Sequence, residues 1–109
     1  MLIDFNQIKE IQVTGMNGGE GEVCAKMFMD KRGKIIPSRI APGASIGMHT
    51  HATSDDINYI LSGEGRAVCD GQEELLQAGV CHICPKGSSH SISNTGSDYL
   101  VMLTVVVER

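Results

Sequence analysis

The sequence lacks an excess of basic residues. Its 109 residues contain 9 Lys and Arg against 13 Asp and Glu, a net charge of −4, and the basic residues are not clustered. A nucleic-acid-binding surface needs a basic patch to neutralise phosphates, so we expect no nucleic-acid partner. Long apolar runs are also missing. No stretch reaches the roughly 18 residues of a membrane-spanning helix, so we expect no membrane partner.

A secretion signal is missing too, because the first residues have neither a positively charged start nor an apolar core. We therefore expect a cytoplasmic protein. Its four cysteines could in principle form two disulfides, but the cytoplasm keeps thiols reduced, and we expect small, buried core residues: Cys24, Cys69, Cys81 and Cys84. Cys81 and Cys84 have the spacing of a redox or zinc motif. Residues three apart in a strand face opposite sides, which argues against that interpretation.

Long helical patterns are absent as well, whereas glycine is abundant at 13 residues. Short alternating segments separated by turn residues are typical of an all-β fold, and the chain length fits one domain. Asp70-Gly71 is the strongest hairpin signal. The expected strands cover residues 22–29, 34–41, 45–51, 56–61, 64–69, 72–76, 80–84, 89–93 and 99–107. Residues 1–13 fit a docking arm or a short strand, and the glycine-rich residues 15–21 a connection.

His49 and His51 are two residues apart, so both rings point to one side of a strand. Two adjacent imidazoles need partners for four ring nitrogens, and a metal ion can take one nitrogen from each. Asp56 follows closely, and His90 begins a later strand. Two readings stay open from these residues alone: a site for a divalent metal, or a solvated or hydrogen-bonded pair of histidines.

Fixed spacings surround these histidines. In the first series, five residues separate Gly43 from His49, and one residue separates His49 from His51. Four residues then precede Asp56, and six more precede Gly63. The glycines lie at expected strand ends, where a barrel turns sharply. A scaffold does not need histidine or aspartate at the other three positions.

In the second series, five residues separate Gly79 from Pro85, and one separates Pro85 from Gly87. Two residues then precede His90, and three more precede Asn94. Together the two series resemble the two motifs of the cupin superfamily, and every position of the second motif matches. The motifs and the hairpin between them cover residues 43–94, about half of the chain.

The resemblance implies a single-domain cupin jelly-roll β-barrel, also called a double-stranded β-helix, over residues 1–109. Residues 1–21 would form an N-terminal arm and glycine-rich loop, and residues 22–107 the barrel. It also implies that His49, His51, Asp56 and His90 bind a divalent transition metal: iron, manganese, nickel, zinc or cobalt. The family usually has Glu where this chain has Asp56. The shorter aspartate would either bind the ion directly or act through a water.

Further residues are expected around the barrel interior. Asn58 and Ile60 share the strand face of Asp56, and His82 shares strand parity with Cys84. The resemblance places these four residues in a substrate pocket. His82 is the candidate catalytic residue, as a base beside the site or a pocket wall, and the alternative is a core histidine bonded to a backbone carbonyl. Its presence in the pocket would favour an enzyme.

The predicted function is that of a small metal-binding cupin. The leading hypothesis is a metalloenzyme of the oxygenase or isomerase type, acting on a small organic acid or a phenolic or polyketide-like substrate. The alternatives are a non-catalytic module that binds or senses a metal or small ligand, and a structural barrel with a vestigial site. Arg39 and Arg66 either hold a substrate carboxylate or are solvated surface charges.

The last expected strand, residues 99–107, is almost continuously apolar. A half-exposed strand should alternate, so both of its faces should be covered. We therefore expect a homodimer that pairs through this strand or through the N-terminal arm.

Overall fold

The strands form two antiparallel sheets, and the computed structural model describes residues 1–109. Two short 3-10 helices, η1 (Phe5–Gln7) and η2 (Met16–Gly18), lie in the N-terminal segment. The strands are β1 (Ile11–Thr14), β2 (Glu22–Ala25), β3 (Phe28–Asp30), β4 (Gly33–Ile40), β5 (Ser45–Thr50), β6 (Ser54–Ser62), β7 (Glu64–Cys69), β8 (Gln72–Gln77), β9 (Cys81–Cys84), β10 (Ser89–Asn94) and β11 (Leu100–Glu108).

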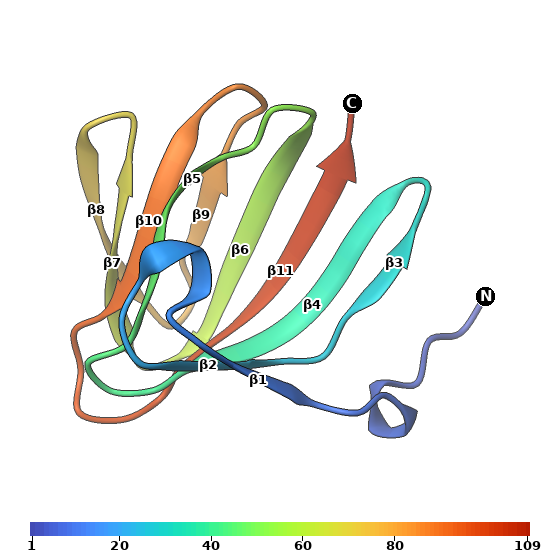
Figure 1. Cartoon of the computed structure of the whole chain (residues 1–109), viewed down its shortest axis with the longest axis horizontal. Coiled ribbons are helices and arrows are strands. Elements are labelled where there is room, and N and C mark those ends of the chain that lie inside the picture. Colours follow the sequence, from blue (N-terminus) through green and yellow to red (C-terminus); the bar gives the residue numbers. More distant parts are fainter.

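The larger sheet has seven strands in the order β1-β2-β4-β11-β6-β9, with β3 also paired to β4. The smaller sheet has four, in the order β5-β10-β7-β8. The chain crosses repeatedly between the sheets, so β10 lies beside β5 and β11 lies between β4 and β6 (Figure 1). The sheets enclose one interior, and this confirms the all-β jelly-roll barrel.

The β7–β8 hairpin turns at Asp70-Gly71, as the sequence predicted. Asp70 and Gly71 both have positive φ, at 49° and 80°, between the paired residues Cys69 and Gln72. Aspartate and glycine tolerate the left-handed conformation that such a two-residue turn requires.

The expected strand over residues 22–29 is two strands, β2 and β3, both paired to β4. The interruption lies opposite Pro37, whose carbonyl accepts the Lys26 N–H at 3.1 Å. Proline has no N–H to return the bond, so the ladder is broken at this point.

The N-terminal segment adds β1 to the larger sheet and then crosses β5. β1 pairs with β2 from Ile11 to Thr14, so this part of the expected arm is a strand. Backbones then pack so closely that a Cβ on Gly19 would lie 2.2 Å from the Ser45 carbonyl oxygen, and one on Gly47 would lie 2.1 Å from that of Asn17. The glycine-rich loop is therefore a connection fitted against β5.

The apolar core fills one end of the barrel interior, which we call the core end. Its members are Val23, Ile40, Ala44, Ile60, Ala67, Leu76, Ile92, Leu100 and Met102. Cys24, Cys69 and Cys84 are buried free thiols, as expected, but Cys81 is exposed. The expectation of a buried Cys81 was wrong because alternation along β9 turns this residue outward. No helix in the structure has the length and apolar character needed to cross a membrane.

Candidate metal centre

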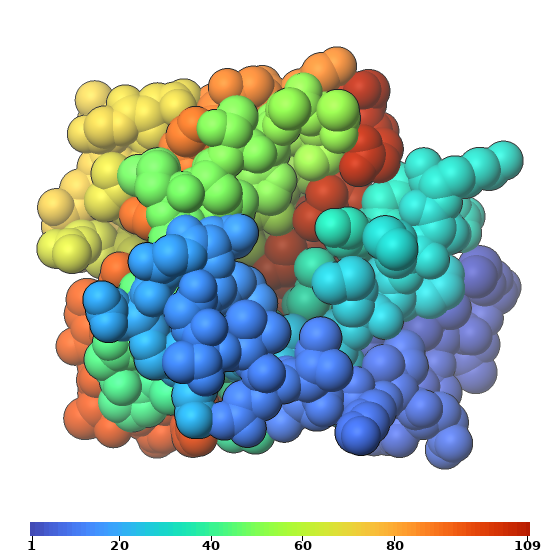
Figure 2. All heavy atoms as spheres, viewed as in Figure 1, coloured from blue at the N-terminus to red at the C-terminus, as the bar shows by residue number.

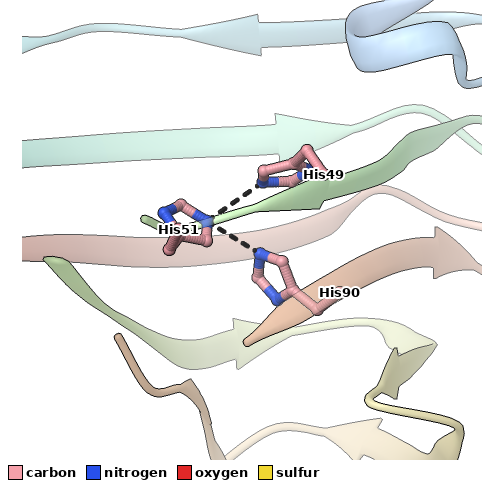
Figure 3. A group of neighbouring side chains, drawn as sticks. All are labelled: His49, His51 and His90. Carbon is pink, nitrogen blue, oxygen red and sulfur yellow. Dashed lines mark hydrogen bonds between the residues drawn. The ribbon is translucent and has the colours of Figure 1, made fainter. Parts of the chain in front are cut away.

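Three imidazoles converge at the other end of the interior, which we call the cavity end. His49 lies on β5, and His51 is the first residue after the end of β5. His90 lies on β10, opposite His49. The Nε2 atom of His51 is 3.0 Å from Nε2 of His49 and 3.1 Å from Nε2 of His90. Figure 3 shows the three rings turned toward one another from two neighbouring strands. One ligand atom from each residue lies within 4.8 Å of the others, so the group could hold one ion.

His49 is held in the form that a metal ligand needs. Its Nδ1 atom lies 2.7 Å from the Gly47 carbonyl oxygen. A carbonyl only accepts, so Nδ1 carries the proton and Nε2 presents its lone pair to the other two rings. Burial lowers the pKa of His51 despite the nearby Asp56 carboxylate, and the neighbouring His90, His49 and Lys34 lower it further. His51 is therefore neutral at pH 7, as metal binding requires.

Asp56 brings a carboxylate to the same point. Its Oδ2 atom is 3.1 Å from Nε2 of His90 and 3.4 Å from Nε2 of His51. Burial alone would raise the pKa of Asp56, but its contacts with His90, Asn58 and His51 bring it below the ordinary value. Asn58 Nδ2 donates to Oδ2 at 3.1 Å, and Thr104 Oγ1 donates to Asn58 Oδ1 at 2.7 Å.

The donor set fits a divalent cation. Nitrogen lone pairs and an ionised carboxylate that converge in a partly buried place repel one another unless a positive charge lies among them. Three histidines and one carboxylate are a ligand set that suits several transition metals. Asp55, which precedes Asp56, points away from this point and instead accepts hydrogen bonds from the Lys86 backbone N–H and from Arg109.

A cavity of about 410 Å³ opens above the imidazoles. Figure 2 shows the hollow between the N-terminal segment in blue, β4 in cyan and residues near 50 in green, with β11 in red at its floor. Its lining is mainly apolar, with Met16, Ile36 and Ile46 among the members. The titratable groups on it are Lys34, His49, His51, Asp56, His90 and Glu108.

Of the four residues expected in the substrate pocket, Asn58 lines this cavity, whereas Ile60, His82 and Cys84 do not. Ile60 belongs to the apolar core, and Cys84 is fully buried, with its pKa raised to about 12 mainly by burial. Strand alternation identifies which face a residue is on but not how deep it lies along the barrel, and these residues lie deeper than the cavity.

His82 lies behind His90. It is 1% exposed, and its ring nitrogens contact Glu74 and His90. His82 is therefore a buried core histidine, as the alternative predicted, but its ring contacts Glu74 and His90 and not a backbone carbonyl. The prediction that it lies on the pocket wall was wrong.

The two arginines lie outside the cavity. Arg39 pairs with Glu10 at 2.9 Å and stacks over the Tyr99 ring at 4.7 Å. Arg66 is exposed on β7. Both agree with the surface-charge interpretation.

Sequence reasoning missed two residues of this region. Lys34 lines the cavity, and it makes no ion pair or side-chain hydrogen bond there. Strand alternation could have predicted the inward position of Lys34, because Lys34, Ile36 and Ser38 share one face of β4. Glu74, the partner of His82, lies on another strand and had no signal.

Comparisons with known proteins agree with this geometry. The family model described as Cupin domain matches residues 38–106. An oxalate-binding protein of Thermotoga maritima is 33% identical over 113 residues, covering 98% of this chain and 93% of that protein. A crystal structure from Thermotoga maritima, described as a predicted oxalate decarboxylase, has a TM-score of 0.92 and 31% identity, with all of both chains covered. The Schizosaccharomyces pombe Cnp3 cupin domain has a TM-score of 0.76 at 13% identity, with 80% of this chain and 61% of that one covered, and supports the fold alone.

Proposed function

This chain belongs to the cupin family, and from that premise we propose that it is a metal-dependent binding protein for a small carboxylic acid, with oxalate as the first ligand to test. A divalent transition metal would be held by His49, His51 and His90. Asp56 would complete the set, either directly or through a water. Iron, manganese, nickel, zinc and cobalt all suit these ligands.

The convergence of three imidazole Nε2 atoms beside the ionised Asp56 carboxylate carries this proposal. A divalent ion bound there supplies positive charge and open coordination positions for a carboxylate oxygen. The cavity, at about 410 Å³, is large enough for an acid of a few carbon atoms.

One group on the cavity wall supports an acid as the ligand. The Lys34 ammonium has no acidic partner, so it can pair with an anion that enters the cavity. A second carboxylate on the ligand would pair with this ammonium while the first binds the ion, which is why we favour a dicarboxylic acid.

The oxygenase or isomerase reading is the second candidate. His82, the residue expected as its acid or base, lies outside the cavity. Lys34 and Glu108 are the titratable groups on the wall other than the proposed ligands, and an oxygenase could use the bound ion itself. We favour binding without turnover because a relative that this chain matches at 33% identity is an oxalate-binding protein.

Calorimetry with oxalate tests the proposal. We expect oxalate to bind the metal-loaded protein and not the chelator-treated protein. Lys34→Met should weaken oxalate binding by roughly tenfold, the worth of one charge-assisted hydrogen bond. Lys31→Met, in the exposed turn of the same hairpin, is the matched control and should bind like the wild type. Failure of oxalate to bind in any metal form would contradict the proposal, and oxygen uptake with iron on small phenols or 2-oxo acids would support the oxygenase instead.

We also propose that two copies pair through the outer face of the larger sheet. Two uncharged rows cross β4, β11, β6 and β9 there: Ile35, Val105, Ile57 and Ile83, then Pro37, Leu103, Tyr59 and Cys81. An uncharged apolar face of this extent on a small protein is typical of a subunit interface. Light scattering during size-exclusion chromatography at micromolar concentration should give the dimer mass. A monomer mass for the wild type, or a dimer that survives Leu103→Lys, would contradict this pairing.

A further inference from the structure

A chain of three side chains runs from the protein surface to the proposed ion site. Glu74 lies on β8 with its side chain 46% exposed, and its Oε1 atom is 2.8 Å from Nδ1 of His82. The Nε2 atom of His82 is 2.9 Å from Nδ1 of His90. The two imidazoles are nearly parallel, with ring centroids 5.1 Å apart. His82 is buried at 1% exposure and does not reach the cavity, so its two ring nitrogens contact only Glu74 and His90.

The partners determine where the protons lie. A carboxylate only accepts hydrogen bonds, so the Nδ1 atom of His82 donates to Glu74. In a neutral imidazole the other nitrogen is then an acceptor, and Nε2 of His82 accepts from Nδ1–H of His90. The Nε2 atom of His90 is left with its lone pair. This is the atom that lies 3.1 Å from both His51 Nε2 and Asp56 Oδ2.

We propose that Glu74 and His82 are positioning residues that fix the tautomer and the ring orientation of His90 for metal binding. This inference rests on the proposed ion site and adds two residues to it. Outer partners of metal-bound histidines commonly act this way, and their loss weakens metal binding roughly ten- to a hundredfold. An apolar core has no need for a histidine at position 82, so the ion site is the feature that accounts for it.

Zinc titration against a chelator of known affinity measures the effect. Glu74→Ala should weaken zinc binding roughly tenfold, and His82→Leu by ten- to a hundredfold. His82→Gln should recover most of the affinity, because its amide oxygen can accept from Nδ1–H of His90 where a leucine cannot. Glu73→Ala, the exposed neighbour on the same strand, is the matched control and should bind zinc like the wild type.

Nitrogen-15 NMR of the histidine rings in the zinc-loaded protein supplies a readout that a purely structural role would not change. The wild type should show the proton on Nδ1 of both His82 and His90. Glu74→Ala should lose this single pattern at His82.

The outcomes separate the two proposals. A wild type that binds no divalent ion would overturn the ion site together with this role. A wild type that binds zinc, with Glu74→Ala and folded His82→Leu binding it equally tightly, would overturn the positioning role alone. So would a proton on Nε2 of His82 in the zinc-loaded wild type. Because Glu74 is half exposed, its variant keeps the test valid if His82→Leu does not fold.

Discussion

The two ends of the barrel interior are built on the same strands, but only the cavity end carries the histidines and the carboxylate of the ion site. Along β6, the inward-facing residues change from Ile60 in the core to Asn58 and then to Asp56 at the ion site. On β10, His90 lies at the site, and Ile92 lies where the apolar core meets the cavity wall. Burial of apolar side chains at the core end stabilises the fold, and this lets the cavity end hold polar groups that a core would not tolerate. Substitutions at the two ends should therefore affect different measurements.

The largest effect on stability is expected at the core end. Ile60 is fully buried, so Ile60→Ala should lower the free energy of unfolding by about 2–5 kcal/mol through lost burial and a cavity. The folded variant should still bind zinc with wild-type affinity. Urea denaturation and zinc titration check the two parts. A large loss of zinc affinity in the folded variant would show that the two ends are not independent.

The converse test is His51→Ala at the cavity end. Removing one of three imidazole ligands should weaken zinc binding by at least about a hundredfold, or roughly 2.7 kcal/mol. The free energy of unfolding of the metal-free protein should change little, because His51 is only partly buried. Thermal melts with and without zinc make the comparison. A variant whose melting temperature still rises with zinc as the wild type's does would contradict the assignment.

A smaller effect is expected from Asp70, which braces the turn before His90. Asp70 Oδ1 accepts the Ser89 backbone N–H at 3.0 Å, and this bond lowers the pKa of Asp70 from its ordinary 3.8. A carboxyl with a lowered pKa in the folded state stabilises the protein above its unfolded pKa. That contribution is lost as the pH falls through the folded value.

Urea denaturation between about pH 5 and pH 2 measures this contribution. The free energy of unfolding should fall less steeply with decreasing pH in Asp70→Asn than in the wild type. Asparagine tolerates the positive φ at this position, so the turn itself should survive the change. Equal slopes in the two proteins would show that the bond to Ser89 adds no stability.

The sequence predicted the parts of this structure that depend on local chemistry. Asp70-Gly71 specified its hairpin because both residues tolerate positive φ. The resemblance of the spacings to the cupin motifs indicated that His49, His51 and His90 would meet. Strand alternation correctly put Asn58 on the inner face beside Asp56.

Depth and long-range partners could not be predicted in the same way. Alternation gave Ile60 and Asn58 the same face, yet only the tilt of the strands in the closed barrel decides which of them meets the cavity. The break opposite Pro37 depends on which edge of β4 pairs with which strand. The contact between Glu74 and His82 joins β8 of one sheet to β9 of the other, and no local pattern contains it.

X-ray absorption spectroscopy of the zinc-loaded protein tests the central claim most directly. If His49, His51 and His90 bind one ion, metal analysis should give one zinc per chain, and the spectrum should show imidazole nitrogens at about 2.0–2.1 Å with the multiple-scattering pattern of three histidine rings. The spectrum of the zinc-loaded His51→Ala variant should show fewer imidazole ligands. A zinc coordinated only by oxygens, or by the same number of imidazoles in both proteins, would contradict the claim.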